Sequence, residues 1–201
     1  MGDRTASVPG HPAQPGPSPA QDRIISAALE LFARNGVGGT SLQMIADTLG
    51  VTKAAVYHQY HTKDEIILAA AEAELARVEV VVRAAEAEPS PARARTSLLT
   101  GMVDLAVAHR RTVSSILNDP VIVRFFTDHE SFRRVMDRMS RVLMGDEIGH
   151  EARVSTAMVT AAISGTVVHP LVAGLDDETL RTQLQRLADR LLPARTPRSG
   201  T

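Results

Sequence analysis

The stretch Thr40–Lys63, TSLQMIADTLGVTKAAVYHQYHTK, contains two short helical segments separated by a tight turn. The first segment has one apolar side, formed by Ile45, Ala46 and Leu49. Gly50 supplies the break where the backbone must leave the helical range, and Thr52 is suited to cap the second helix. The pattern predicts a helix-turn-helix, an arrangement whose second helix fits the major groove of DNA.

Capping patterns mark two helix starts around this stretch. Thr40 and Gln43 fit a capping box before the first helix, and Thr62 and Glu65 fit another where a third helix begins. Such side chains satisfy backbone N–H groups that have no partner within the helix. We therefore expect helices to begin directly after Thr40 and Thr62.

Composition excludes several classes of site and protein. The 201 residues include no cysteine, so disulfides and thiolate-bound zinc or iron–sulfur sites are ruled out. No run approaches the ~18 consecutive apolar residues of a membrane span, and no apolar segment follows the N-terminal charges. We expect a cytoplasmic protein with no membrane partner and no cofactor.

The charge of the chain gives no global attraction to nucleic acid, because the formal net charge is −1. Local placement of Lys53, Lys63 and hydrogen-bond donors matters more for a module that docks in a groove. An aromatic content of 3% without Trp argues against single-strand binding by base stacking. Double-stranded DNA is the nucleic acid that fits these features.

The periodicity of the chain is helical throughout, and the predicted fold is all-α with about nine helices. Residues 1–20 are rich in Pro, Gly, Ser and Ala, so we expect a disordered tail there. A first helix is expected over 21–35, and a long one from Lys63 until Pro89 forbids its continuation. Further helices are expected near 91–109, 112–117, 120–143, 149–168 and 176–192.

The last two helices have the composition of a dimer interface. Residues 149–168 are rich in Ala, Ser, Thr and Gly, which let a neighbouring helix approach closely. Residues 176–192 carry leucines at helical spacing, at positions 180, 184, 187 and 191. We expect these helices to supply half of a four-helix bundle in a homodimer, the alternative being that both pack on their own subunit.

The stretch 22–68 resembles the DNA-binding domain of the tetracycline-repressor (TetR-like) family of bacterial transcriptional regulators. The resemblance rests on LFARNG at the end of the first helix, on Thr40, Ser41, Ile45 and Ala46, on Gly50-Val51, and on Tyr57-His58-x-Tyr60-x-x-Lys63. It covers about a quarter of the chain. Three departures are Val37 in place of an aromatic residue, Gln43 at a position that is often basic, and Tyr60 in place of Phe.

The resemblance implies a DNA-binding domain at 21–67, a ligand-binding and dimerisation domain at 68–193, and a second tail at 194–201. Contacts with DNA are expected from Thr40, Gln43, Thr52, Lys53, Ala54, Ala55, Tyr57, His58 and Lys63. The two alanines are small enough to let the helix sit deep in the major groove, and Lys53 can reach guanine or phosphate. Phosphate contacts by Thr40, Tyr57 and Lys63 are implied by the resemblance.

Soft and bulky apolar residues in the C-terminal part suit a pocket for an apolar or aromatic molecule, although each alone also suits a plain core. The candidates are Met102, Phe125, Phe126, Phe132, Met136, Met139 and Met158. His109 and His169, each at the end of an apolar run, are candidates to orient a ligand. His58 and His61 lack the further ligands that a metal site needs, so no metal is expected.

These features together predict a homodimeric repressor that binds a palindromic DNA operator and leaves it when a small-molecule effector binds. The alternative is a helical dimeric interaction protein without DNA binding, in which residues 40–63 only cap the dimer. No P-loop, nucleophile elbow or dinucleotide fingerprint occurs, so an enzyme is not expected.

Overall fold

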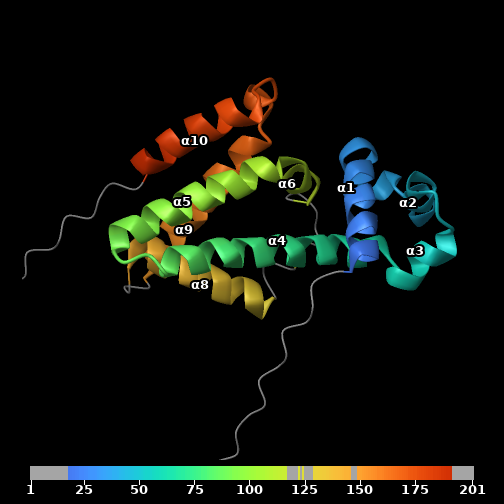
Figure 1. The fold of residues 1–201 in the computed structure, drawn as a ribbon, viewed down its shortest axis with the longest axis horizontal. Coiled ribbons are helices and arrows are strands. Elements are labelled where there is room, and N and C mark those ends of the chain that lie inside the picture. The colour runs from blue at the N-terminus through green and yellow to red at the C-terminus, as the bar shows by residue number, and fades with distance from the viewer. Residues whose placement is uncertain (1–17, 117–121, 123, 125–128, 146–148, 192–201) are drawn as a thin grey trace, which may run out of the picture.

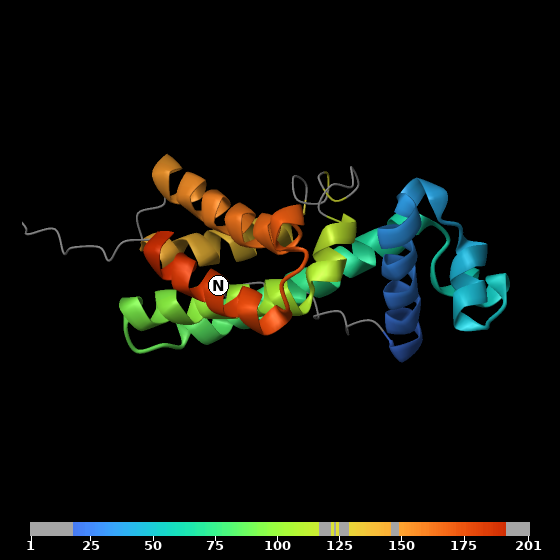
Figure 2. The ribbon, with the colours of Figure 1, turned by 90° about the horizontal axis from the view of Figure 1, so that it is seen from above.

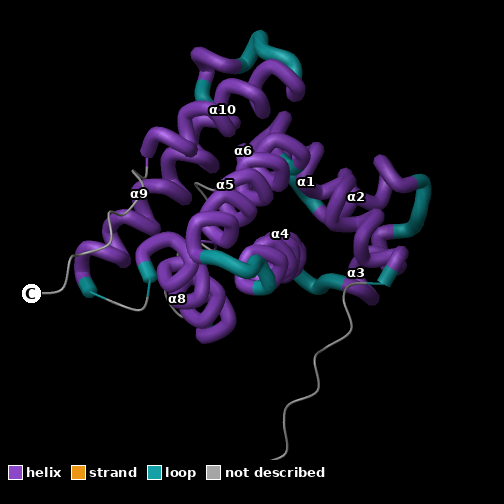
Figure 3. The backbone as a smooth tube through the Cα atoms, turned by 60° about the vertical axis from the view of Figure 1, so that its left-hand side comes forward, coloured by secondary structure: helices purple, strands orange, loops and turns teal. Residues whose placement is uncertain are grey.

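The computed structural model describes residues 18–116, 122, 124, 129–145 and 149–191. These residues form helices joined by loops, and no strand occurs among them (Figure 3). The all-α fold predicted from the periodicity is confirmed. The expected tails fall almost entirely outside the described residues and stay predictions.

Nine α-helices occur in the described part of the chain. The N-terminal ones are α1 (Pro19–Gly39), α2 (Leu42–Leu49), α3 (Lys53–Gln59) and the long α4 (Lys63–Glu86). The others are α5 (Pro91–Ala108), α6 (Arg110–Ile116), α8 (Glu130–Met144), α9 (His150–Val167) and α10 (Asp177–Leu191), with a 3₁₀ turn at Pro170–Val172. None of these helices is both long and apolar enough to cross a bilayer.

The molecule is elongated along α4 (Figure 1). Helices α1, α2 and α3 gather at one end of α4 (Figure 2). Helices α5 and α8 pack against its other half, α9 packs on these two helices, and α10 packs on α5 and α9. Helix α6 follows α5 directly and packs against α1. The two ends of the molecule are therefore connected both by α4 and by the contact between α6 and α1.

Helix α4 contributes buried side chains to two hydrophobic clusters. Its first half buries Ile66, Ile67 and Ala70 in a cluster with α1, α2 and α3. Its second half buries Val82 and Ala85 in a cluster with α5, α8, α9 and α10. The expected domain boundary at residues 67 and 68 thus falls inside one continuous helix.

Local signals set the ends of α1. Ser18 and Gln21 form a capping box, in which the Ser18 hydroxyl accepts from Gln21 N–H at 3.3 Å and Gln21 Oε1 accepts from Ser18 N–H at 2.8 Å. Gly36 has φ 71° and ψ 161°, a conformation that L side chains rarely adopt. The helix expected over 21–35 therefore kinks at Gly36, and one more turn runs to Gly39.

The predicted cap of α2 at Thr40 is wrong by one residue. Ser41 is the N-cap, and its hydroxyl accepts from Met44 N–H at 3.2 Å. Thr40 instead donates its hydroxyl hydrogen to the Gly36 carbonyl at 2.9 Å and is 3% exposed. The two neighbouring hydroxyl residues therefore have different roles: Ser41 caps α2, and Thr40 closes the turn after α1.

A three-residue ion cluster ties α8 to α4. The Arg138 guanidinium donates to both carboxylate oxygens of Glu86, at 3.0 and 2.6 Å, and to Glu79 Oε1 at 3.1 Å. The hydrogen bonds from Arg138 lower the pKa of Glu86. A bidentate arginine fork has a fixed geometry, so this cluster sets the position of α8 along α4.

Candidate DNA interface and ligand cavity

The turn between α2 and α3 depends on one glycine. Gly50 has φ 65° and ψ 31°, in the left-handed region, and its N–H donates to the carbonyls of Ala46 and Asp47. This conformation ends α2 and lets the chain turn at once into α3. The Thr52 hydroxyl then caps α3 by accepting from Ala55 N–H at 3.2 Å.

Helix α3 has one face inside the domain and one face exposed. Val56 is fully buried and Tyr60, directly after the helix, is 7% exposed. Burial raises the pKa of Tyr60, and the nearby carboxylates of Asp22 and Glu72 raise it further. The inward face therefore anchors α3 and leaves its opposite face to solvent.

The exposed face of α3 has a small apolar centre with polar neighbours. Ala54 and Ala55 are exposed, as are Lys53 and His58. Tyr57 is 52% exposed, and its ring meets the edge of His61 with ring centroids 4.8 Å apart. The small side chains at the centre of this face leave room for the floor of a major groove to come close to the helix backbone.

Three other predicted DNA-binding residues are engaged within the domain. The Gln43 side chain is exposed, but its amide donates to Asp47 Oδ1 at 2.7 Å. Lys63 Nζ donates to the Val37 carbonyl at 2.6 Å and thereby joins the start of α4 to the end of α1. Thr40 is buried. The contacts of these three residues with DNA stay predictions. In the structure each of them has a role inside the domain.

A cavity of about 360 Å³ lies between α4, α5, α6, α8 and α9. Its apolar wall includes Leu75, Val78, Met102, Leu105, Phe132 and Met136. Its polar lining residues are Glu74, His109, Thr160 and Ser164. A mainly apolar cavity with a few polar groups is the usual form of a small-molecule site.

Glu74 is the polar centre of this cavity. Its Oε1 lies 3.1 Å from His109 Nδ1 and accepts from Arg77 Nη1 at 2.8 Å. Burial raises the pKa of Glu74, while Arg77 and His109 oppose the rise. Glu74 is not among the residues predicted from the sequence. Its signal is the helical spacing of Ala70, Ala71, Glu74 and Val78, which places a carboxylate on an apolar face.

The structure brings together four of the nine predicted ligand-binding residues. Met102, His109, Phe132 and Met136 line the cavity. Met139 lies in the core at 1% exposure, whereas Met158 is 68% exposed. His169 lies outside the cavity, where its Nδ1 accepts from Leu171 N–H at 3.2 Å and caps the 3₁₀ turn. Phe125 and Phe126 lie outside the described residues.

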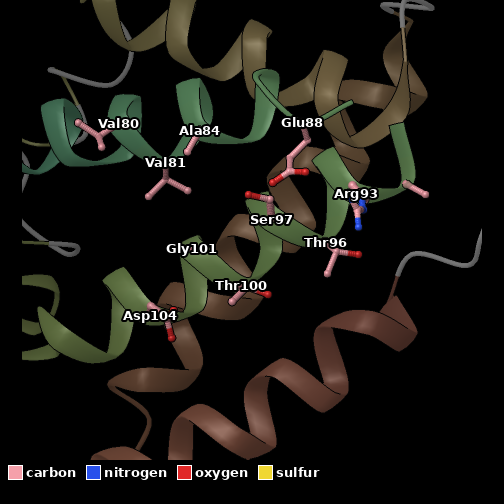
Figure 4. A pocket seen from close by; sticks show the side chains of 11 residues that line it. Val80, Val81, Ala84, Glu88, Arg93, Thr96, Ser97, Thr100, Gly101 and Asp104 are labelled. Carbon is pink, nitrogen blue, oxygen red and sulfur yellow. The ribbon is translucent and has the colours of Figure 1, made fainter. Parts of the chain in front are cut away.

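A second hollow is an open groove of about 880 Å³ between α4 and α5 (Figure 4). Val80, Val81 and Ala84 border it on α4, and Thr96, Thr100 and Gly101 on α5. A Cβ atom on Gly101 would lie 2.6 Å from Val81 Cγ1. The absence of a side chain at Gly101 is therefore what lets the two helices approach so closely at this point.

Helices α9 and α10 lie against each other and expose large apolar side chains. Val154 and Met158 on α9 are 57% and 68% exposed, and Leu187 on α10 is 51% exposed. Leu180 and Leu184 are instead buried in their own subunit. The leucine repeat of α10 is thus divided between the core and the surface.

Known proteins resemble the N-terminal part of the chain in sequence. A sequence model described as "Bacterial regulatory proteins, tetR family" matches residues 24–70. The regulator SrpR of Pseudomonas putida is 45% identical over 49 residues, 24% of this chain and 23% of that protein. IcaR of Staphylococcus epidermidis, named a negative transcriptional regulator of a biofilm operon, is 39% identical over 46 residues, 23% and 25% of the two chains. The matches span between 18% and 37% of such curated relatives.

Solved structures resemble nearly the whole chain in fold. A tetR-family protein from Rhodococcus RHA1 matches with a TM-score of 0.70 and 22% identity, over 90% of this chain and 100% of that one. PfmR, a tetR-family transcriptional regulator from Thermus thermophilus, matches with a TM-score of 0.71 and 18% identity, over 90% and 99%. Residues 24–70 therefore match the helix-turn-helix domain of the tetR family of bacterial regulatory proteins, and nearly the whole chain shares the fold of solved tetR-family proteins.

Proposed function

We propose that this chain is a homodimeric transcriptional repressor that binds a palindromic DNA operator and releases it when a small molecule occupies the cavity. The observation that carries the proposal is the exposed face of α3, with Ala54 and Ala55 at its centre, on a helix-turn-helix of the tetR family. The N-terminal residues 21–67 would bind DNA, and residues 68–193 would bind ligand and dimerise.

In the proposed complex, α3 lies in the major groove. Ala54 and Ala55 approach thymine methyl groups, and Lys53 reaches a guanine or a phosphate. Tyr57 and His58 are exposed on α3 as well, and in this arrangement they would contact the DNA. Phosphate contacts fix the register of the protein on the duplex, while contacts with base edges supply specificity.

Dimerisation through α9 and α10 would place two copies of α3 on one face of the duplex. Val154 and Met158 follow the spacing i, i+4 on α9, and exposed Ala162 and Gly165 continue the same stripe. Two such stripes can pack closely because the small residues admit a partner helix. A two-fold dimer binds two half-sites about one or more helical turns apart, which is why we propose a palindromic operator.

Release by a ligand would act through α4. Glu74, Leu75 and Val78 of α4 line the cavity. The same helix begins at Lys63, whose side chain is hydrogen-bonded to the end of α1. A ligand that favours a displaced α4 shifts the population toward dimers whose recognition helices no longer match successive grooves. Each tenfold loss of DNA affinity requires about 1.4 kcal/mol of differential ligand binding.

The test is a gel-shift experiment with the DNA that lies upstream of the protein's own gene. The proposal expects a discrete complex that resists an excess of DNA of scrambled sequence. A protein that is folded and dimeric but prefers neither DNA would contradict the proposal and support the alternative, a helical interaction protein that does not bind DNA.

A further inference from the structure

The two hydroxyl groups that line the cavity already donate their hydrogens within α9. Thr160 donates its hydroxyl hydrogen to the Thr156 carbonyl at 2.9 Å, and Ser164 donates to the Thr160 carbonyl at 2.7 Å. Each hydroxyl carries one hydrogen, and in both residues that hydrogen is directed to the backbone of α9. Their oxygen lone pairs are what remain for a ligand.

The carboxylate of Glu74 adds a stronger acceptor. Oε1 is bonded to Arg77 and faces His109, whereas Oε2 has no hydrogen-bond partner among the described residues. The Glu74 side chain is only 17% exposed, so a donor from a ligand would pair with it in a largely dry site.

The remaining lining is apolar and sets the size of the ligand. A volume of about 360 Å³ holds on the order of ten non-hydrogen atoms, at the ~30 Å³ that one water molecule occupies in the liquid. The rings and thioethers of Phe132, Met102 and Met136 suit an aromatic or aliphatic body. An anionic head would meet lone pairs and would add a second negative charge beside Glu74.

We propose that the cavity binds a small apolar molecule with a hydrogen-bond-donating head, an amine or an alcohol, that donates to Oε2 of Glu74. The proposal rests on the ligand-sensing part of the proposed function. It identifies Glu74 as the residue that selects the head group, with Arg77 and His109 holding Oε1 so that Oε2 is presented to the ligand.

The experiment compares three probes of matched shape by calorimetry on the full chain: 4-butylbenzylamine, 4-butylbenzyl alcohol and 4-butylbenzoate. We expect the amine and the alcohol to bind at least tenfold more tightly than the benzoate. Glu74→Gln replaces one acceptor oxygen by an N–H donor and should remove most of that preference. Glu72→Gln, the same change at a carboxylate that is 59% exposed on α4 and outside the lining, should leave it unchanged.

Equal or tighter binding of the benzoate, or no binding of any probe, would overturn the proposal. An unchanged preference in folded Glu74→Gln would overturn the role of that residue. If Glu74→Gln fails to fold by thermal melting, the three affinities of the unaltered protein still decide the question. The gel shift is run without any probe, so its outcome does not depend on how the probes bind. A protein that binds its operator but binds the benzoate most tightly would contradict this inference and leave the proposed DNA binding intact.

Discussion

Ala55 lies on the exposed face of α3, where the main chain can come closest to the bases of a groove. We predict that Ala55→Glu lowers operator affinity by at least 100-fold, because a carboxylate is driven toward the phosphates and base acceptors. Fluorescence anisotropy of a labelled operator fragment measures the change. The folded state should be unaffected, since the new side chain points into solvent.

Ala84→Glu is the matched control for that change. Ala84 is an exposed alanine on α4 that borders the open groove (Figure 4). Helix α3 lies at the other end of α4 (Figure 1). Ala84→Glu adds the same charge as Ala55→Glu but away from α3. The operator affinity of this variant should therefore stay close to that of the unaltered chain. A comparable loss in both variants would point to a general electrostatic effect and remove α3 from the interface.

Tyr60 makes the stability of the N-terminal domain sensitive to alkaline pH. Burial raises its pKa above the ordinary value of 10.0, so the folded state prefers the neutral phenol. The resulting stabilisation is present below pH 10 and is lost as the pH rises from there through the pKa of the folded state. Tyr60→Phe should therefore unfold less readily than the unaltered protein at pH 11, with little difference at pH 7.

Urea denaturation at the two pH values measures this difference. Comparing the two proteins at each pH cancels the titration of lysines, which both share. If the stability of the two proteins differs by the same amount at pH 7 and pH 11, the burial of the Tyr60 hydroxyl has no energetic consequence.

At the scale of the elements, Gly101 sets the spacing of α4 and α5. Gly101→Ala gains up to about 1 kcal/mol in helix propensity but places a methyl group against Val81, at a cost of about 1–3 kcal/mol. We predict a net loss of thermal stability. Val81→Ala made together with Gly101→Ala should recover most of it, because the double variant restores the space between the helices.

Calorimetric melting of the single and double variants tests this account. Additive effects of the two substitutions would contradict it, since side chains in contact must show coupling. Thr100→Ala serves as a control, because it changes the neighbouring, exposed position of α5.

The helices themselves were predictable because their signals are local. Periodic apolar positions, Gly50 and Pro89 identify elements from the residues alone. The cap of α2 was not predictable to the residue, because Thr40 and Ser41 both suit an N-cap. Which of the two becomes the cap depends on Gly36. The kink at Gly36 lets its carbonyl accept a hydrogen bond from the Thr40 hydroxyl, which leaves Ser41 as the cap.

The cavity was predictable only in part, because periodicity shows which residues face inward but not what they face. Met136 and Met139 both lie on the inner side of α8, yet one lines the cavity and the other is core. Glu74 was not predicted because it is the charged residue on an otherwise apolar face of α4. Which residues of neighbouring helices meet is decided by how those helices cross.

At the scale of the whole molecule, the exposed stripe on α9 supports the proposed dimer. Met158→Glu places a charge in the middle of that stripe, where burial against a partner would be costly. We predict a monomer at concentrations that keep the unaltered protein dimeric, measured by sedimentation equilibrium. Leu184→Arg is a poor test, because Leu184 is buried in its own subunit.

Val80→Glu is the control for the dimer prediction. Val80 is an apolar side chain of α4 that is 56% exposed and lies far along the sequence from α9. This variant should remain dimeric. A dimer that persists in Met158→Glu and also in Val154→Glu would place the interface elsewhere.

The central claim is that two copies of α3 read a two-fold symmetric site on DNA. Hydroxyl-radical footprinting of the protein on the DNA upstream of its own gene tests this claim most directly. The account predicts two protected segments related by two-fold symmetry, with centres about 10 base pairs or a multiple of that apart. Uniform protection along the fragment, or none at concentrations where the folded dimer is present, would contradict it.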